Sequence, residues 1–357
     1  MTGRGVDQIL PHPGDPKLYE SHVKDAREYV ELAEAAHGLL TRPVSFKYIW
    51  GDLLSDLDRA HLAHRIINLE TSITSNDEPW PGKPIQYKMH PQNIDCLTAG
   101  RIRACTLANN HVLDWHYDGL CETLDALDHA GILHAGAGRN LAEARAPAAL
   151  AFGSHRLLLF GLGSPTSGIP PDWAATSTKP GVHLLDDLSP QNARKIAAQM
   201  RDQQKPGDLI IASIHWGANW GFEVPHEQIE FAHELIDNGV ALVHGHSSHH
   251  IKALEVYKNH LILYGCGDLL TDYEGIQGYE PFRGDLAFLY LPELAPETGH
   301  LLALRLIPVQ TRRLQLHHTS TEDTKYLHSW MNNACAGFAP KFALTADNNL
   351  EFHSPVI

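Results

Sequence analysis

Four stretches of the chain place metal-ligand side chains directly after short apolar runs. The stretches are Asn68-Leu69-Glu70, Ala108–His111, Ile214–Gly217 and His244–His250. Together they supply a carboxylate, amides and imidazoles, and they contain no thiolate. Such an oxygen and nitrogen ligand set suits Mn, Fe(II), Zn or a mixed pair of metals. The last stretch is the strongest signal, because it holds four histidines in seven residues.

Each stretch also has an ordinary structural interpretation. Glu70 alone would more often be a loop carboxylate or a helix cap, and Asn109-Asn110 is common in turns. His215 could be a core histidine whose ring nitrogens are hydrogen-bonded. The combination of the four stretches is therefore more specific than any one of them.

The apolar runs before these stretches predict buried strands, at Arg65–Leu69, Ile102–Ala108, Arg156–Leu162, Asp208–Ile214 and Val240–Val243. Helical stripes lie between some of them and end near Gly131 and Gly239, where a helix C-cap favours glycine. This alternation is typical of an α/β fold. Ligands of open α/β sheets bind outside the carboxyl ends of the strands, so we expect the four stretches to converge.

The later chain predicts a second, more antiparallel sheet. Its expected strands are Ile251–Tyr257, Leu261–Tyr264, Asp285–Leu291 and Leu301–Val309. A helix at Glu322–Ala334 and a hairpin at Phe342–Phe352 are expected to close the fold. The segment Gly163–Ser189 is expected to be a long, lid-like loop. Because no linker or repeat divides the chain, we expect a single domain over residues 1–357 that includes the C-terminal helix and hairpin (about 320–357).

The charge balance restricts the partners. Lys and Arg number 28 and Asp and Glu number 42, which gives a net charge of −14. A general surface for nucleic acid or anionic membrane is therefore not expected, and an anionic substrate must be held at a local site. The absence of a long apolar run and of an export signal in the given sequence predicts a cytoplasmic protein without a transmembrane segment. Five cysteines without CxxC spacing predict neither disulfides nor a thiolate zinc site.

Several blocks resemble the signatures of the CapA family, the capsule or poly-gamma-glutamate biosynthesis proteins. The blocks are NLETSIT (68–74), LANNHVLDW (107–115), GAGRNLAEARAP (136–147), HWGANWG (215–221), HGHSSHH (244–250) and YGCGDLLTDYEGIQGYEPFRGDL (264–286). The resemblance implies a calcineurin-like metallophosphoesterase fold. This fold is a four-layer α/β/β/α sandwich with a site for two divalent metal ions at one edge of its sheets.

The resemblance also implies roles for individual residues. Glu70 would be the acidic ligand at or near the bridging position, and Asn110 would bind one metal through its amide oxygen. His215 and His246 would be imidazole ligands. His249 would complete the ligand set, with His250 as the alternative.

Two further residues would act on the substrate rather than on the metal. The resemblance makes His111 the acid that faces the substrate, outside the metal ligands. Asp114 follows three residues later and is expected to orient the His111 ring, with a role at a helix start as the alternative.

One departure from the family concerns the beginning of the sequence. In the family, the stretch that resembles residues 1–10 follows a first β-strand that ends in Gly-Asp, and its aspartate is a metal ligand. We therefore expect the sandwich to lack its first strand in the sequence given. A start codon assigned too late is our preferred explanation; truncation and a true absence of the strand are the alternatives.

The function implied is capsule or poly-gamma-glutamate biosynthesis, with a two-metal, hydrolase-type site acting on a phosphoester or an anionic polymer. The substrate would be an anionic small molecule, peptide or polymer. One alternative is a metal-dependent enzyme that modifies peptides, for example an epimerase. Another is a degenerate scaffold without catalytic activity.

Overall fold

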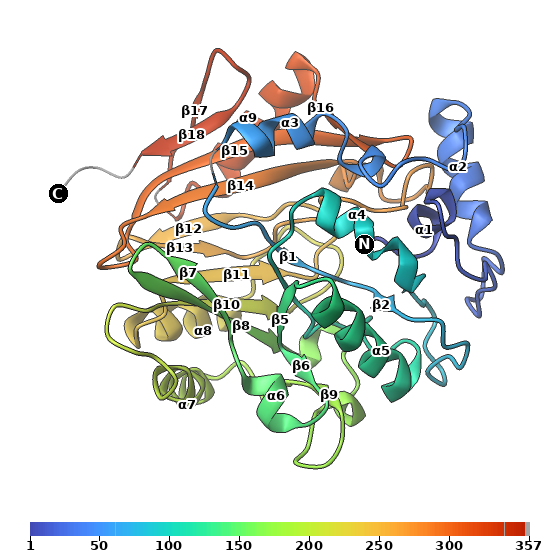
Figure 1. Cartoon of the computed structure of the whole chain (residues 1–357). Coiled ribbons are helices and arrows are strands. Elements are labelled where there is room, and N and C mark those ends of the chain that lie inside the picture. The colour runs from blue at the N-terminus through green and yellow to red at the C-terminus, as the bar shows by residue number, and fades with distance from the viewer. Residues whose placement is uncertain (61, 339, 354–357) are drawn as a thin grey trace.

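The computed structural model describes residues 1–60, 62–338 and 340–353, which form a mixed α/β structure (Figure 1). Its largest sheet has six strands in the order β12-β13-β11-β10-β8-β7. The bounds are β7 Ala148–Phe152, β8 His155–Gly163, β10 Leu209–His215, β11 Leu242–His246, β12 Leu254–Tyr257 and β13 His260–Leu263. The four central strands are parallel, and the two edge strands are antiparallel to their neighbours.

Two smaller sheets lie beside it. The parallel sheet β1-β4-β5 contains β1 Ile66–Asn68, β4 Ala104–Thr106 and β5 Leu133–Ala135. The antiparallel sheet contains β14 Leu286–Leu294, β15 Leu301–Arg312, β16 Gln315–His318, β17 Ala343–Leu344 and β18 Leu350–His353. Two pairs of very short strands complete the set: β2 Ser72–Ile73 with β3 Lys88–Met89, and β6 Ala137–Gly138 with β9 Gly181–Val182.

Two of the longer helices, α5 and α8, end where the sequence places glycine. The α-helices are α1 Gly5–Ile9, α2 Arg27–His37, α3 Leu53–Arg59, α4 Asp95–Ala99, α5 His116–His129, α6 Leu141–Arg145, α7 Pro190–Arg201, α8 His226–Asp237 and α9 Thr321–Ala334. Gly131 after α5 and Gly239 after α8 have φ values of 67° and 97°, which glycine adopts at low cost. The helix boundaries expected near these glycines are thus confirmed.

The two-residue period of β10 separates two cores. Ile210, Ala212 and Ile214 belong to the core that includes residues of α7 and α8. Leu209 and Ile211 belong to a different core, which includes residues of β1, β14 and β15. Residues 213 and 215 continue the second set, so their side chains face the smaller sheets.

The expected strands are confirmed within a few residues, but two expectations about their arrangement were wrong. The strand expected at Val240–Val243 continues to His246, since His244 to His246 keep the parallel ladder with β10. The hairpin β12–β13 joins the six-stranded sheet, because β13 pairs in parallel with β11. Only β14 to β18 form the separate antiparallel sheet, and β1 and β4 belong to a sheet of their own.

The later elements agree with expectation. The helix expected at Glu322–Ala334 is α9, and the hairpin expected at Phe342–Phe352 is β17–β18. The Gly163–Ser189 segment contains two short 3-10 turns and the two-residue strand β9, and is otherwise irregular.

A close backbone contact joins the β1-β4-β5 sheet to the six-stranded sheet, next to the loop that follows β4. Gly136, at φ 91°, lies against Ala108 and Gly161, and a Cβ added to it would stand 2.8 Å from Ala108 Cβ and 2.8 Å from Gly161 Cα. Only glycine avoids both the strained backbone and this overlap.

The N-terminal turn is held by the distant loop that follows β13. The guanidinium of Arg4 is buried and donates to both carboxylate oxygens of Asp272, at 3.0 and 2.6 Å. It also donates to Glu20 and lies 3.8 Å from the ring centroid of Tyr29. This buried ion pair joins residues that are 268 positions apart.

Across residues 1–60, 62–338 and 340–353, no helix combines the length and the apolar character needed to cross a bilayer.

Candidate functional site

The polar site begins on the inner face of two neighbouring strands. Ser213 and His215 of β10 stand opposite His244 and His246 of β11 in the parallel register. The side-chain period of two aims all four at the smaller sheets, close to the carboxyl ends of the strands. Two sequence-predicted ligands, His215 and His246, are thereby neighbours.

His215 contacts three other residues predicted for the site. Its Nδ1 lies 2.8 Å from His246 Nδ1, while its Nε2 lies 3.1 Å from Asn110 Oδ1 and 3.7 Å from Glu70 Oε1. The His215 side chain has no exposed surface. The four stretches therefore converge, as the strand ends predicted, with His215 at their centre.

One ring nitrogen of His246 faces His215, and the other faces the hydroxyl group of Ser213. Its Nε2 lies 3.0 Å from Ser213 Oγ, which also lies 2.9 Å from His244 Nδ1. A buried hydrogen-bonded chain therefore runs from His215 through His246 and Ser213 to His244.

Glu70 is positioned by two asparagines. Asn68, the last residue of β1, lies two residues earlier and donates to Glu70 Oε2 at 3.0 Å. Asn109 donates to Asn68 Oδ1 at 3.1 Å and to the Leu69 carbonyl at 2.9 Å. The loops after β1 and β4 are thus joined, which sets Glu70 and Asn110 side by side.

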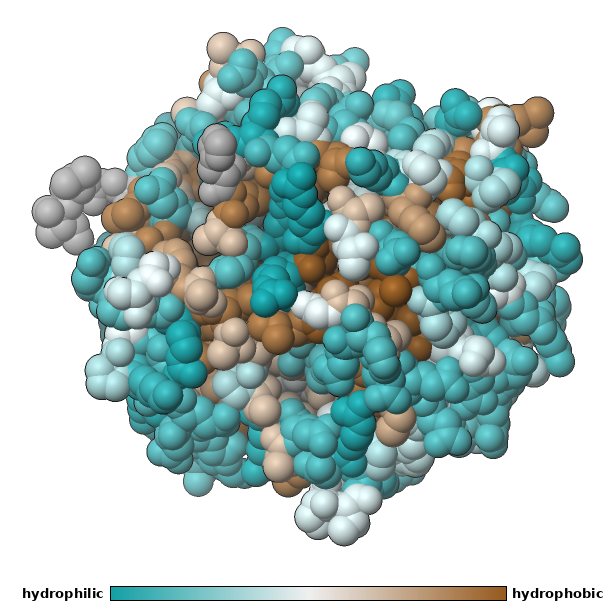
Figure 2. All heavy atoms as spheres, in the orientation of Figure 1, coloured by the Kyte–Doolittle hydropathy of each residue, from teal (hydrophilic) through white to brown (hydrophobic). Residues whose placement is uncertain are grey.

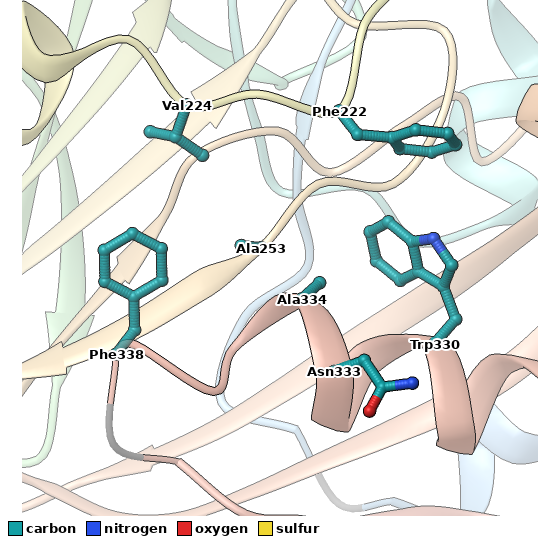
Figure 3. Close-up of a pocket in the computed structure, with 7 residues that line it drawn as sticks. All are labelled: Phe222, Val224, Ala253, Trp330, Asn333, Ala334 and Phe338. Atoms are coloured by element: carbon teal, nitrogen blue, oxygen red, sulfur yellow. The ribbon is translucent and has the colours of Figure 1, made fainter.

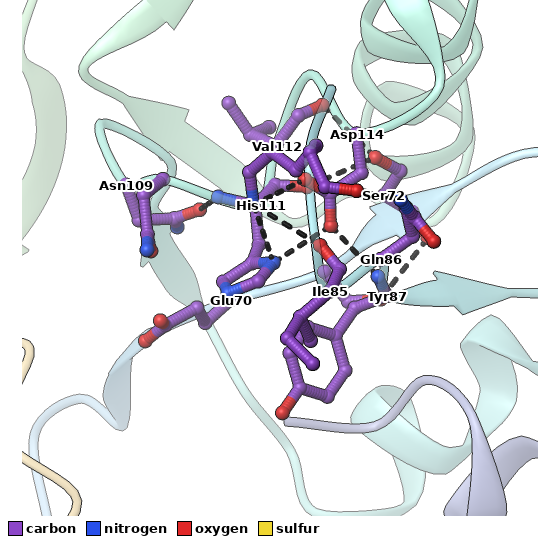
Figure 4. A network of polar contacts seen from close by, with 12 residues as sticks. Glu70, Ser72, Ile85, Gln86, Tyr87, Asn109, His111, Val112 and Asp114 are labelled. Atoms are coloured by element: carbon purple, nitrogen blue, oxygen red, sulfur yellow. Dashed lines mark hydrogen bonds and ion pairs between the residues drawn. The ribbon is translucent and has the colours of Figure 1, made fainter. Parts of the chain in front are cut away.

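His111 and Asp114 form the second part of the site (Figure 4). His111 Nδ1 lies 2.7 Å from Asp114 Oδ2, which also accepts from the backbone N–H of Tyr87 at 2.7 Å. An ionised Asp114 can only accept, and its contact with Nδ1 is shorter than the 3.1 Å from Nδ1 to the Lys83 ammonium, so we place the proton of a neutral His111 on Nδ1. Figure 4 shows Glu70 on the side of the His111 ring away from Asp114. The free Nε2 of His111 is thus on the Glu70 side.

His249 and His250 have different surroundings. His249 Nδ1 lies 2.9 Å from Asp268 Oδ2, and its Nε2 lies 3.4 Å from the Tyr273 hydroxyl. Both ring nitrogens of His250 bind the backbone, one to the Ile251 carbonyl at 3.0 Å and the other to Gly221 N–H at 3.1 Å. Both His250 nitrogens are thus engaged by the backbone, and of the two histidines only His249 is hydrogen-bonded to side chains.

Burial dominates the electrostatics of the site. It raises the pKa of Glu70 to about 7 and lowers the pKa of His111 to about 4, although Asp114 opposes the second shift. Burial also holds the pKa of His215 and of His246 well below the usual value. For His249 burial also lowers the pKa, but the charge and hydrogen bond of Asp268 together with the charge of Glu70 outweigh it, and the pKa is raised.

The donors around His215 Nε2 fit a divalent cation in their chemistry. An imidazole nitrogen, a carboxylate oxygen and an amide oxygen meet there, which is a ligand set that Mn, Fe and Zn accept. His246 stands at the other ring nitrogen, and His249 contacts Asp268 and Tyr273 instead. In the part of the chain that the structure describes, no group of three or more His, Cys, Asp or Glu side chains is arranged to hold a metal ion. The metal roles of Glu70, Asn110, His215, His246 and His249 therefore stay predictions.

Sequence reasoning did not assign roles to several residues at the site. Asn68 could have been found, since it lies at the carboxyl end of the expected strand, two positions before Glu70. Lys83 and Tyr273 come from irregular loops, where no periodicity indicates which way a side chain points.

A separate groove of about 440 Å³ lies between the loop after β10 and the end of α9 (Figure 3). It is lined by Phe222, Val224, Ala253, Trp330, Asn333, Ala334 and Phe338. These side chains include no acid, base or nucleophile.

Comparison with known proteins identifies relatives over nearly the whole chain. A protein of Mycobacterium tuberculosis named "probable polyglutamine synthesis accessory protein" is 44% identical over 353 residues, which are 98% of this chain and 93% of the relative. The capsule biosynthesis protein CapA of Bacillus anthracis is 24% identical over 273 residues, 76% of this chain and 58% of its own. The PGA biosynthesis protein CapA of Bacillus subtilis is 24% identical over 191 residues, 53% of this chain and 48% of its own.

A family model agrees with these relatives. The model described as "Bacterial capsule synthesis protein PGA_cap" matches residues 1–273, which include every residue predicted for the site. The resemblance drawn from the sequence blocks is thereby confirmed, and the chain belongs to the bacterial capsule synthesis protein family PGA_cap.

Proposed function

We propose that the protein takes part in capsule or poly-gamma-glutamate biosynthesis and has a metal-dependent, hydrolase-type site for a phosphoester or an anionic polymer. The observation that carries the proposal is the convergence of Glu70 and Asn110 on Nε2 of the buried His215. The names of the relatives supply the biological setting. We expect a cytoplasmic location, which cell fractionation tests.

Glu70, Asn110 and His215 would hold one divalent cation, with His246 beside it. His249, steadied by Asp268, would contribute to a second. We propose Mn, Fe or Zn, given the nitrogen and oxygen ligands. Bound cations would supply an activated water and neutralise negative charge on the substrate.

His111 would transfer a proton between the attacking water and the leaving oxygen of the substrate. Asp114 holds the Nδ1 proton, so Nε2 is free to take a proton from the water and return it to the leaving oxygen. The buried carboxylate of Asp114 also stabilises the imidazolium that forms in between. Asp114 is thus a positioning residue, while His111 would act on the substrate.

We propose the four-layer α/β/β/α sandwich for the fold, with α7 and α8 forming one outer layer on the six-stranded sheet. The two smaller sheets would together form the second β-layer, since β1, β14 and β15 share one core with the inner face of that sheet. Helices including α4 and α5 would cover its other side.

The gap between the two smaller sheets is where we place the first strand expected from the family. A cavity of about 350 Å³ lies there, bordered by β1 and β14 and reaching Met1 and Glu70. In the described part of the chain, β1 pairs with β4 alone and β14 with β15 alone. Figure 2 shows apolar atoms at the centre of the corresponding face. A strand in this slot would pair with both edges and join the two sheets.

Metal binding tests the function directly. Titration of the metal-free protein with Mn²⁺ in a calorimeter should show tight binding that is weakened at least about 10-fold in Glu70→Gln and His215→Ala. His129→Ala, an exposed histidine of α5, is the matched control. The wild-type protein should then hydrolyse members of a phosphoester or poly-gamma-glutamate panel only when it is loaded with metal. A wild-type protein that binds no Mn²⁺, Fe²⁺ or Zn²⁺ would indicate a scaffold and refute the proposal.

A further inference from the structure

Lys83 lies at the back of the His111 and Asp114 pair. Its ammonium is 2.7 Å from Asp114 Oδ1 and 3.1 Å from His111 Nδ1, and it donates to the Ile85 carbonyl at 3.3 Å. Only 9% of its side chain is exposed. The charge of Lys83 therefore faces Asp114 and His111 inside the protein.

Asp114 depends on this lysine for one of its two oxygens. Oδ2 accepts from Tyr87 N–H and from His111 Nδ1–H. Oδ1 is buried and, among the described residues, has no hydrogen-bond donor. The ammonium of Lys83 is the group that faces it. A carboxylate with one oxygen bare in a fully buried site is costly, so loss of Lys83 would favour a rotated Asp114.

The rotation would be felt at His111, because Asp114 Oδ2 is the acceptor for the His111 Nδ1 proton. If Oδ2 moves, the ring loses the bond that fixes both its orientation and the nitrogen that carries the proton. The free Nε2 would then no longer be held on the Glu70 side.

We propose that Lys83 is a positioning residue, which holds the Asp114 carboxylate so that His111 presents Nε2 to the candidate site. The use of His111 in a reaction rests on the proposed function, but the positioning itself does not. The competing interpretation is that Lys83 binds an anionic substrate.

The positioning can be measured without any activity. In nitrogen-15 labelled wild-type protein, His111 should give a solvent-protected Nδ1–H signal with the shift of a strong hydrogen bond, and Asp114→Asn identifies it by changing it. Lys83→Met should lose or strongly broaden this signal, and Lys83→Arg should restore it.

Lys88 offers a matched control. It is likewise a buried lysine, paired with Asp77 at 2.5 Å and placed over the Trp115 ring, and the structure gives it no contact with His111. Lys88→Met should leave the His111 signal unchanged. If Lys83→Met does not fold, Lys83→Gln, which keeps a polar end, takes its place. A folded Lys83 variant with an unaltered His111 signal overturns the proposal.

Inorganic phosphate separates positioning from substrate binding. With Mn²⁺-loaded protein, Lys83→Met should bind Mn²⁺ and phosphate within about twofold of the wild type, while turnover of any active phosphoester falls about 10- to 100-fold in kcat, as is typical when a supporting hydrogen bond is lost. Weaker phosphate binding with an intact His111 signal would make Lys83 an anion contact and overturn the proposal. A wild type that neither binds metal nor turns over a substrate would refute the proposed function, while the His111 signal would still decide the role of Lys83.

Discussion

His215 and His246 face each other through their Nδ1 atoms, 2.8 Å apart, on neighbouring parallel strands. One Nδ1 must donate a proton to this hydrogen bond and the other must accept it. The accepting Nδ1 carries no proton, so at least one of the two rings is neutral. Burial favours this, because it holds the pKa of both well below the usual value. A cation at His215 Nε2 would leave this pair intact, so His246 would support His215 from its other ring nitrogen.

The neighbouring histidines of the HGHSSHH block should respond differently to substitution. His249→Ala should lower the affinity for the second Mn²⁺, while His250→Gln should keep the binding stoichiometry. His250→Gln should instead lose about 1–3 kcal/mol of stability, since two buried backbone groups lose their partner. Calorimetric metal titration and urea unfolding separate the two effects. An equal loss of Mn²⁺ binding in both variants would contradict the assignment of His249, and not His250, to the second metal.

A buried histidine away from the site should make the protein sensitive to acid. Burial lowers the pKa of His183 to about 4, and its Nδ1 has no hydrogen-bond partner among the described residues. In the unfolded chain its pKa is about 6.5, so the unfolded state gains a proton first and stability falls as pH drops from about 6.5 to 4. The loss is up to about 3 kcal/mol. Urea unfolding across this range should show a smaller loss for His183→Gln and an unchanged loss for the exposed His129→Ala.

Two glycines at positive φ should differ in their tolerance of a methyl group. Gly136→Ala should destabilise the protein by about 3 kcal/mol, since it adds overlap with Ala108 and Gly161 to backbone strain. Gly153 has a φ of 58° and open space around it, so Gly153→Ala should cost about 1 kcal/mol. Thermal unfolding of both variants checks this, and equal losses would show that the contact with Ala108 is unimportant.

The slot between β1 and β14 should bind an apolar dye unless a strand occupies it. A chain extended by the residues encoded directly upstream of Met1 should lose dye binding and should protect the amides of Ile66–Asn68 and Leu286–Leu294 from hydrogen exchange. A Gly-Ser extension of equal length is the control and should do neither. Similar dye binding and exchange for both extensions would contradict the first strand proposed here.

Sequence patterns anticipated the elements better than their assembly. The apolar runs located β8 and β10 because buried strands need continuous apolar residues. They could not assign β13 to the larger sheet, since strand pairing depends on contacts between distant segments. The convergence of Glu70, Asn110 and His246 on His215 followed from strand ends, which sequence reveals. The direction of Lys83 did not, because an irregular loop has no period.

The ion pair between Arg4 and Asp272 has a consequence for biosynthesis. Asp272 leaves the ribosome long after Arg4, because the two residues lie 268 positions apart, so Arg4 lacks this partner while the chain between them is made. Until then the Arg4 guanidinium must stay hydrated, pair with Glu20 alone or be shielded by a chaperone, since its charge cannot be buried without partners. The turn that carries Arg4 can thus reach its native place only after the loop that holds Asp272 has been made.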